Sequence, residues 1–453
     1  MATLSTARLG SANTYDNAIR TVTARQAALS GLQENLTSGK RVVRASDDPT
    51  SAAIAERALT RISRIATDQR ALESQRTAIT QAESTLGDVT DALHRFRELV
   101  VSAGNGVHSG AERHTIAIEM QGLRDQVFAL ANTKDTSGLP LFNALGSALT
   151  PFVGPQATAP DYTFNGLPGQ SAASAVSIPF TLDGDSAFMH QPARDGTFNA
   201  IVTNPVDGLI SPDRTLITDN VVITDSAIVS AIATAAQAVA PPANVPYPKY
   251  TLAFTSVDTT TVPGTTTVIY NITETPPVSG GTTPAIVSPV TNSYPTGTSI
   301  KVPDAANFIT PGETGIPGLA FTITGTPKLG DTVTIDSSPS IFSVMDDAIR
   351  DIGVAVNNNA STQAVSQALH NIDIGMERVS NVRGQAGELL NRADRISGNQ
   401  EKRSIQMEDN RSRAEDLDMV KGISDFQNQQ TGYSAALQTY AQIQKLSLFN
   451  FIS

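Results

Sequence analysis

Apolar residues recur at helical spacing near the start of the chain, and this pattern predicts a long first helix over residues 4–38. Its apolar stripe is formed by Tyr15, Ile19, Val22, Leu29, Leu32 and Leu36. Gly39 follows as a residue that can end the helix, because glycine readily adopts a left-handed conformation. After a short loop, Asp48-Pro49 predicts an N-cap followed by a proline at the first position of the next helix.

A seven-residue apolar repeat marks this second helix, which is expected over residues 50–102. The repeat positions, which we call the bundle seam, are Ile65, Leu72, Ile79, Leu86, Leu93 and Val100. Such a repeat keeps one side of a helix facing a partner helix. Because the other seam position is often polar, as at Gln69, Arg76 and Glu83, we expect packing among several helices. A shorter helix is expected over residues 112–132.

Helical spacing returns near residue 341 and continues to the end of the chain. In the last helix, expected over residues 417–452, one face carries Ile423, Phe426, Tyr433, Leu437, Tyr440 and Ile443. The chain then closes on an apolar cluster of Leu446, Leu448, Phe449, Phe451 and Ile452. Such a short segment cannot bury this cluster by itself, so the cluster needs a partner in the same domain or in another chain.

The middle of the chain has the opposite pattern, with short apolar runs between turn residues. Strands are expected at 176–182, 198–202, 221–223, 250–256, 266–273, 319–324 and 332–335. Residues 225–240 form the one helix expected there. The Thr- and Pro-rich stretch 257–298 gives the weakest indication of regular structure.

Composition divides the chain in the same places. Of the 25 prolines, 23 lie between Ser147 and Ser340, whereas only 19 of the 75 charged residues lie there. The sequence therefore predicts a multidomain α+β fold. Its N- and C-terminal segments together form a long helical bundle or coiled-coil domain, and a β-rich domain is inserted between them. The expected parts are residues 1–150 and 339–453 for the helical domain, and 151–338 for the β-rich surface region.

Charge and composition exclude several classes of function. The net charge is −11, and the middle contributes 14 acidic against 5 basic residues, a surface that would repel nucleic acid. Cysteine is absent, which excludes disulfides, thiolate metal sites and a cysteine nucleophile. No segment has the roughly 20 apolar residues of a membrane span, and no apolar signal peptide is visible at the N-terminus. That absence fits both a cytoplasmic protein and export by a dedicated machine.

Candidate chemical groups have simpler structural explanations. His108, Glu112 and His114 are close in sequence, but their spacing matches no metal-ligand signature. Asp47 and Asp48 could form a carboxylate pair, but the N-cap role accounts for Asp48. We therefore expect no catalytic residues, no metal and no cofactor.

Two terminal motifs resemble a known family. The segment LTSGKRVVRASDDPTSAAIAE at residues 36–56 resembles the N-terminal signature of the flagellin family. The ending LSLFNFIS at 446–453, preceded by Asp418 and Gln429-Gln430, is similar to the branch of that family at the hook–filament junction. In the middle, DGDSAFM at 183–189 with GTF at 196–198, and FTITGTPKLGD at 321–331, resemble the β-rich domain of this branch, whereas 257–298 departs from it.

The resemblance implies a structural, non-enzymatic adaptor of the bacterial flagellum. Members of this branch are secreted unfolded through the flagellar export channel, fold on assembly, and form a ring between an upstream hook-side junction protein and flagellin. A cytoplasmic export chaperone binds their C-terminal segment. The implied location is the extracellular flagellum at the hook–filament junction, with no nucleic-acid or membrane partner.

The residues expected at the assembly interface are Tyr15, Ile19, Val22, Leu29, Leu36, Ile423, Phe426, Tyr433, Leu437, Tyr440, Leu446, Leu448, Phe449 and Phe451. Two alternatives stay open at this point. The chain could be flagellin itself, the bulk filament subunit. It could also be a surface enzyme or adhesin seated on a flagellar scaffold, with its active or binding part near 257–298.

Overall fold

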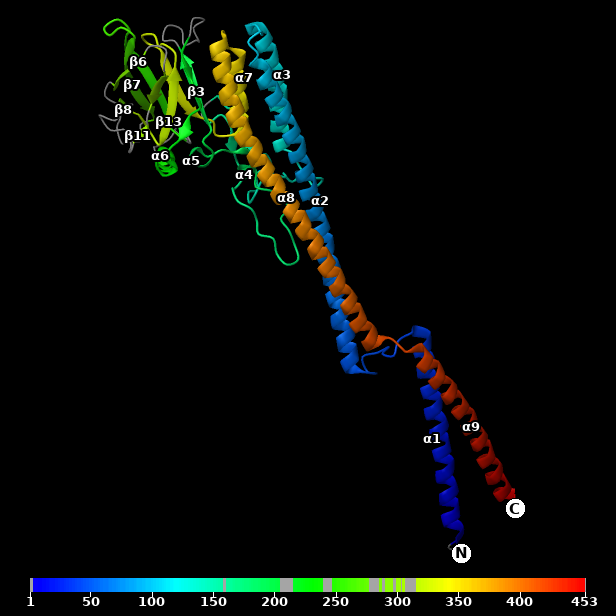
Figure 1. Ribbon diagram of the computed structural model, residues 1–453. Coiled ribbons are helices and arrows are strands. Elements are labelled where there is room, and N and C mark those ends of the chain that lie inside the picture. The colour runs from blue at the N-terminus through cyan, green and yellow to red at the C-terminus, as the bar shows by residue number, and fades with distance from the viewer. Residues whose placement is uncertain are drawn as a thin grey trace. The chain divides into compact units, whose positions relative to one another are not determined.

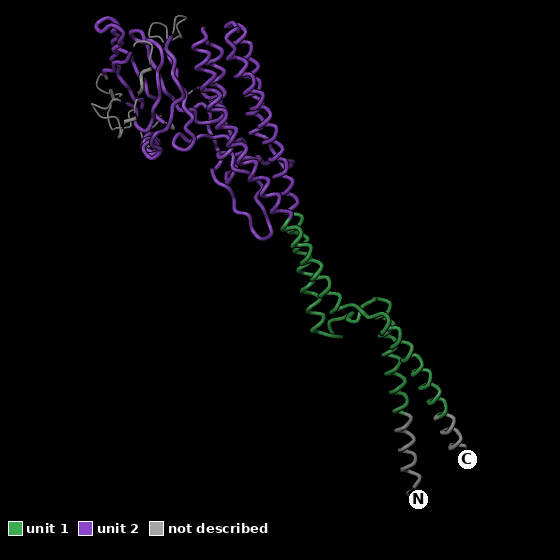
Figure 2. Tube along the Cα trace, viewed as in Figure 1, with its two compact units in different colours: residues 1–71, 395–453 green, residues 72–394 purple. Residues whose placement is uncertain are grey.

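The computed structural model divides the chain into two compact units (Figure 2). Unit 1 comprises residues 1–71 and 395–453, and unit 2 comprises residues 72–394. The backbone is described for residues 3–157, 160–203, 215–238, 247–276, 285–286, 290–295, 299–302, 304–305 and 315–452. Side chains are described for residues 16–157, 160–203, 215–237, 247–276, 291–295, 315–442 and 444. Unit 1 therefore joins the two ends of the chain, and unit 2 holds everything between them.

The helices at the two chain ends pair within unit 1. α1 (Thr3–Ser38) contacts α9 (Met419–Ile452), and the two helices lie side by side near the loop that follows α1 (Figure 1). Gly39 follows α1 with φ of 70°, the left-handed conformation that the sequence predicts for the end of this helix. Among the described residues, none of the helices has the continuous apolar length that a bilayer crossing requires.

α2 (Pro49–Ala103) begins in unit 1 and continues into unit 2. The Asp48 Oδ1 accepts hydrogen bonds from the backbone N–H groups of Thr50 and Ser51 at 3.2 and 3.1 Å. These contacts confirm the predicted N-cap, with Pro49 at the first helical position. Hydrogen bonds from Ser51 and Thr50 also hold the pKa of the Asp48 carboxyl well below its ordinary value.

In unit 2, α2 lies antiparallel to α8 (Asn358–Glu415). Arg97 Nε contacts Asp373 Oδ1 at 2.7 Å, and farther along, Arg76 Nη2 contacts Asp394 Oδ1 at 3.4 Å. As residue numbers fall on one helix they rise on the other, which fixes the antiparallel direction. A second pair of helices, α3 (Gly110–Ala131) and α7 (Ile341–Gly353), also packs together.

The β-rich part of unit 2 has two six-stranded sheets among the described residues. One has the order β3-β14-β6-β7-β8 with β9 also on β7, and the other has the order β10-β13-β12-β11 with β4 and β5 also on β13. The strands of the first sheet are β3 (Phe198–Thr203), β6 (Lys249–Asp258), β7 (Thr265–Thr275), β8 (Ala285–Ile286), β9 (Val290–Pro295) and β14 (Thr332–Ser337). Those of the second are β4 (Ile217–Thr218), β5 (Val222–Ile223), β10 (Ser299–Val302), β11 (Asp304–Ala305), β12 (Ile316–Pro317) and β13 (Leu319–Thr324). The two sheets and α6 (Ser226–Ala238) share one apolar core.

This architecture confirms the predicted α+β fold, with long terminal helices and a central β-rich region. The strands predicted at 198–202, 250–256, 266–273, 319–324 and 332–335 all form, and 221–223 is represented by the short β5. Part of the stretch 257–298 is regular, because β7 runs through it and pairs with both β6 and β9. Residues 277–284, 287–289 and 296–298 of this stretch lie outside the described residues.

The strand predicted at 176–182 is wrong, because this segment is a loop. Its Ile178 is buried, and the Ile178 N–H donates to the side-chain oxygen of Gln75 on α2 at 3.0 Å instead of to a neighbouring strand. The Ser177 N–H donates a hydrogen bond to Ser174 Oγ at 3.0 Å, and this contact forms a turn at the start of the segment. Side-chain and helix contacts therefore replace the sheet hydrogen bonds that the alternating pattern predicts.

Four short elements near this loop have no counterpart in the sequence prediction. They are β1 (Phe152–Val153), β2 (Thr163–Phe164), α4 (Gly184–Phe188) and α5 (Pro192–Asp195). These elements lie beside α3 and α7 around a cluster of aromatic side chains. The members of this aromatic cluster are Phe128, Phe142, Phe152, Tyr162, Phe164, Phe188 and Phe342. The cluster fastens the segment 141–190 onto the end of the helical part of unit 2.

Candidate assembly surfaces

Within the family-like segment 36–56, residues 39–48 form the loop between α1 and α2, and this loop contacts the C-terminal part of the chain. The Arg41 N–H donates to the carbonyl oxygen of Glu415 at 2.7 Å, and the Leu417 N–H donates to that of Gly39 at 2.9 Å. Lys40 and Glu415 also form an ion pair. The loop thus makes strand-like contacts with the link between α8 and α9, which sets α1 and α9 side by side.

Close approach of α1 and α9 depends on a glycine. A Cβ atom at Gly422 would lie 2.9 Å from Leu417 Cδ2 and 3.2 Å from Leu36 Cδ2, so a larger residue would push these side chains away. Asp418 caps α9, because its Oδ1 accepts from the Val420 N–H at 3.0 Å. Asp418 and Gly422 therefore fix the start of α9 beside the end of α1.

The predicted interface residues on α1 and α9 have two kinds of environment. Ile19, Ile423 and Leu437 are exposed, with 38%, 47% and 40% of their surface accessible. Val22, Leu29, Leu36, Phe426, Tyr433 and Tyr440 are half-buried. Tyr15, Leu446, Leu448, Phe449 and Phe451 lie outside the residues whose side chains are described. Their role in assembly remains a prediction.

Two exposed apolar side chains at the start of α9 were missed by the sequence prediction. Val420 is 82% exposed and Met419 is 46% exposed. Together with Ile423 they form an apolar group on the first turns of α9, which we call the α9 patch. The sequence signal that could have identified this patch is the pair of adjacent apolar residues directly after the cap residue Asp418.

The bundle seam is mostly interior in the structure. Leu72, Ile79, Leu86, Leu93 and Val100 are buried within unit 2, and Ile65, in unit 1, is half-buried. Phe96 and Val89 of α2 are also fully buried on the same helix. The seam residues of unit 2 therefore belong to its core and are not available to a neighbouring molecule.

Three buried amide side chains of α8 hold the β-rich part against the helices. Gln363, Gln367 and Asn371 are four residues apart and so lie on one face of α8. Gln363 Nε2 donates to the Ala200 carbonyl at 2.6 Å, and the Ala200 N–H donates to Gln367 Oε1 at 3.3 Å. Asn371 Nδ2 donates to the Phe198 carbonyl at 2.9 Å. This amide row satisfies backbone groups of the edge strand β3 that another strand would otherwise pair with.

The amide row also reaches the second sheet. The Thr218 N–H of β4 donates to Gln363 Oε1 at 3.3 Å, and Gln367 Nε2 donates to Thr218 Oγ1 at 3.2 Å. One helical face therefore binds β3 and β4, which belong to different sheets.

Replacing Gln367 with leucine is expected to destabilise unit 2 by about 1–3 kcal/mol, because the Ala200 N–H and the Thr218 hydroxyl lose a buried partner. Urea unfolding followed by circular dichroism measures the change. Gln385→Leu makes the same substitution at an exposed position on the same helix, so it is the matched control and should shift stability by less than about 0.5 kcal/mol. Equal stability of the two variants would show that the amide row is not stabilising.

α7 makes the second connection to the β-rich part. Ser338 Oγ, directly after β14, donates to Asp347 Oδ2 at 2.6 Å, and Asn199 Nδ2 of β3 donates to Asp351 Oδ2 at 2.8 Å. Arg350 pairs with Asp347 at 2.8 Å and with Asp351 at 2.9 Å. Burial raises the pKa of Asp347 to about 6, although Arg350 opposes this shift.

This shift predicts a pH dependence that Asp347→Asn should remove. Asp347 has a higher pKa in the folded protein, about 6, than its ordinary value of 3.8. Between these values the folded state binds more protons than the unfolded chain, so this group favours folding increasingly as pH falls through 6 towards 4. Wild type should therefore gain on the order of 2–3 kcal/mol relative to Asp347→Asn over this range. Urea unfolding of both proteins at several pH values between 4 and 7 tests this prediction. If the free energies of unfolding of the two proteins changed in parallel with pH, the raised pKa of Asp347 would be contradicted. The buried His190, whose pKa is lowered to about 4, acts in the opposite direction but is present in both proteins.

The family-like segment 183–189 organises a group of buried charges. Asp183 caps α4, because its Oδ1 accepts from the Asp185 N–H at 3.1 Å and its Oδ2 accepts from Ser186 Oγ at 2.8 Å. Asp195, at the end of α5, pairs with Arg194 at 2.8 Å and with Arg378 of α8 at 3.1 Å. This ion pair fastens the short helices to the helical part of unit 2.

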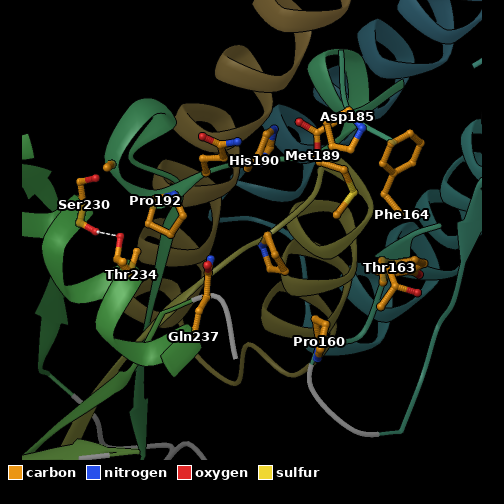
Figure 3. A pocket seen from close by; sticks show the side chains of 16 residues that line it. Pro160, Thr163, Phe164, Asp185, Met189, His190, Pro192, Ser230, Thr234 and Gln237 are labelled. Carbon is orange, nitrogen blue, oxygen red and sulfur yellow. Dashed lines mark hydrogen bonds between the residues drawn. The ribbon is translucent and has the colours of Figure 1, made fainter. Parts of the chain in front are cut away.

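A cleft of about 560 Å³ opens beside these charges (Figure 3). Asp185, Met189 and His190 lie along one side of it, and Thr234 and Gln237 of α6 lie along another. Nothing in the sequence prediction pointed to this cleft, because its walls come from separate segments of the chain.

The rejected candidate groups have structural partners. Glu112 accepts hydrogen bonds from the N–H and the hydroxyl of Ser109 at 2.7 and 2.9 Å, which forms a capping box at the start of α3. Asp47 Oδ2 accepts from the Arg44 N–H at 2.8 Å. In the described part of the chain, no group of three or more histidine, aspartate or glutamate side chains is arranged to hold a metal ion.

Comparison with known families places both chain ends in one family. Residues 11–146 match the bacterial flagellin N-terminal helical region, and residues 369–452 match the bacterial flagellin C-terminal helical region. These ranges contain most of α1, all of α2, α3 and α9, most of α8, and the loop at 39–48.

Individual relatives agree with these matches. The chain is 32% identical over 200 residues to flagellar hook-associated protein 3 of Escherichia coli, which covers 42% of this chain and 57% of the relative. It is 34% identical over 153 residues to the protein of the same name from Salmonella typhimurium, covering 32% of this chain and 46% of the relative. The chain thus spans about half the length of these curated relatives.

The fold is also that of a solved flagellar protein. The crystal structure of FlgL from Xanthomonas campestris matches 78% of this chain and 98% of its own, with a TM-score of 0.50 and 20% sequence identity. This match supports the shared architecture of terminal helices and a β-rich middle. The chain therefore carries, at its two ends, the N- and C-terminal helical regions of bacterial flagellin.

Proposed function

We propose that this protein is a structural adaptor subunit of the bacterial flagellum, located outside the cell at the hook–filament junction. The observation that carries the proposal is the structure of unit 1, in which α1 and α9 pair and leave apolar side chains exposed on both helices. The name of the two curated relatives, flagellar hook-associated protein 3, supports a place next to the hook.

An adaptor must offer different surfaces to the hook side and to the filament side. We infer that copies of the chain form a ring through head-to-tail contacts, with the hook-side junction protein on one side and flagellin on the other. The exposed Ile19 and Leu437 and the α9 patch are the surfaces that such neighbours would cover. This role requires no catalysis and no cofactor.

We further propose that the chain is exported unfolded and that unit 1 completes its folding during assembly. A cytoplasmic export chaperone would hold the C-terminal segment beforehand. The absence of cysteine supports this route, because no disulfide could obstruct passage of an unfolded chain. Partly exposed apolar helices gain most of their burial only when neighbours surround them.

The second candidate is flagellin itself. It is supported by the matches of both terminal regions to models of bacterial flagellin. The long helices α1 and α9, each with exposed apolar side chains, would serve a filament subunit as well as an adaptor. Growth of long filaments from the purified protein on flagellar seeds would favour this alternative.

Imaging of tagged protein on intact flagella separates the two candidates. An adaptor should give a single band at the base of each filament, whereas a filament subunit should label the whole length. A tag in the β6–β7 turn at residues 259–264 keeps the terminal helices unmodified, because this turn lies within unit 2. Label along the entire filament would overturn the adaptor proposal.

A further inference from the structure

The cleft in unit 2 has the size of a small-molecule site. Its volume of about 560 Å³ lies within the range of roughly 300–1,000 Å³ that is usual for small-molecule sites. Apolar groups of Tyr162, Phe164, Met189 and several prolines form much of its wall. Polar groups also face it, among them those of Thr163, Asp185 and Gln237, and such groups can orient a ligand held by the apolar wall.

The first of these polar groups is the carboxylate of Asp185. Among the described residues it has no ion-pair or hydrogen-bond partner. Arg194 and Arg378 lie close enough to influence it, but both are paired with Asp195 at 2.8 and 3.1 Å. Asp183 adds a second negative charge nearby, and burial followed by this charge raises the pKa of Asp185. The carboxylates of Asp183, Asp185 and Asp195 therefore outnumber the guanidinium groups of Arg194 and Arg378 in this cluster.

The second polar group is His190, which is only 4% exposed and lines the same cleft. Neither ring nitrogen has a hydrogen-bond partner within normal geometry. Burial lowers the pKa of His190 to about 4, against the opposing influence of Asp195. The imidazole is therefore neutral at physiological pH, and both of its nitrogens are shielded within the wall of the cleft.

We infer that this cleft binds a guanidinium or ammonium group carried on a flexible apolar stem. Such a group has only donors, and it would meet the carboxylate of Asp185, which only accepts, beside a wall that includes the neutral imidazole of His190. The stem would lie along the proline and aromatic walls, as the stems of arginine and lysine do on apolar surfaces. The group could come from a small amine-bearing compound or from a basic side chain in an extended peptide.

Isothermal titration calorimetry of the full chain tests the inference with two probes. N-acetyl-L-arginine amide represents a free compound, and an acetylated and amidated Gly-Gly-Arg-Gly-Gly peptide represents a side chain on a partner. The citrulline analogues of both probes have nearly the same shape without the charge, and they should show no measurable binding. Binding of the peptide alone would identify a protein segment as the source, and equal binding of both probes would show that the side chain suffices.

Asp185→Asn should weaken binding of the arginine probes by about tenfold or more, because the charge-assisted contact is lost. The substitution keeps the shape of the side chain, and circular dichroism verifies that the fold is retained. Asp88→Asn, which removes an exposed carboxylate on α2, is the matched control and should bind as wild type does. Failure of both arginine probes to bind wild type, or equal affinity of wild type and Asp185→Asn, would overturn the inference.

Discussion

Removing residues 428–453 is expected to leave unit 2 folded and to abolish incorporation of the protein at the hook–filament junction. The deletion removes most of α9, which packs against α1 in unit 1. Unit 2 has its own apolar core, shared by its two sheets and α6, and contains none of the deleted residues. The truncated chain should therefore keep a cooperative thermal transition while losing the apolar surface that neighbours would cover.

The measurement combines thermal unfolding of the purified chain with imaging of flagella in cells that express only the truncated form. We expect no label at the filament base and a severe loss of motility. Filaments that assemble normally on the truncated protein would falsify the proposed role of α9. Loss of the thermal transition would instead show that unit 2 depends on the C-terminal helix.

A single substitution tests the same surface without shortening the chain. Ile423 in the α9 patch is 47% exposed, so Ile423→Asp should change the stability of the isolated chain by less than about 0.5 kcal/mol. In an assembly it would place a charge in an apolar contact, so incorporation should fall sharply. Ser424→Asp adds the same charge at the adjacent exposed position and should be tolerated.

The helical parts of the fold were predictable because their signals are local. The ends of α1 and α2 depend on Gly39, Asp48 and Pro49, and each of these acts through backbone geometry or through hydrogen bonds within a few residues. The seven-residue repeat of α2 likewise requires only the residues of that helix. Expected and observed bounds of these two helices therefore differ by no more than one residue.

The attachment of the β-rich part could not be predicted, because it depends on polar side chains that meet distant backbone groups. Gln363, Gln367 and Asn371 have the spacing and polarity of an ordinary solvated helical face. They are buried only because β3 presents unpaired N–H and carbonyl groups at that position. Sequence periodicity does not distinguish a solvated amide from one that replaces a neighbouring strand.

The division into compact units also differs from the division by composition. The change in proline and charge content places boundaries near residues 150 and 338, whereas packing separates residues 72–394 from the two ends. α2 and α8 extend through both units, so no change in composition marks the packing boundary.

The candidate interface was partly visible in the sequence, since the exposed apolar side chains lie on helices whose periodicity the sequence shows. The cleft was not, because its lining combines the segment 160–168, α5 and α6.

Phe342→Ala is expected to have the largest effect of any single core substitution considered, about 3–5 kcal/mol of lost stability. Phe342 lies in the first turn of α7 and is fully buried within the aromatic cluster. Its ring centroid lies 5.2 Å from those of both Phe128 and Tyr162, and 5.7 Å from that of Phe152. The alanine variant would leave a cavity among large, rigid rings that cannot easily close around it.

The loss should be measurable by urea unfolding as a lower midpoint with an unchanged slope, since the surface exposed on unfolding is nearly the same. Phe180→Ala is the matched control, because it removes the same side chain from a position that is 43% exposed. Phe180→Ala should lower the free energy of unfolding by less than half as much as Phe342→Ala, since the ring of Phe180 is already partly in contact with water. If Phe342→Ala cost no more than Phe180→Ala, the aromatic cluster could not be what fastens the segment 141–190 to α3 and α7. The attachment would then depend on polar contacts alone, such as those of Tyr162 with Arg124 and Asp346, each at 2.6 Å.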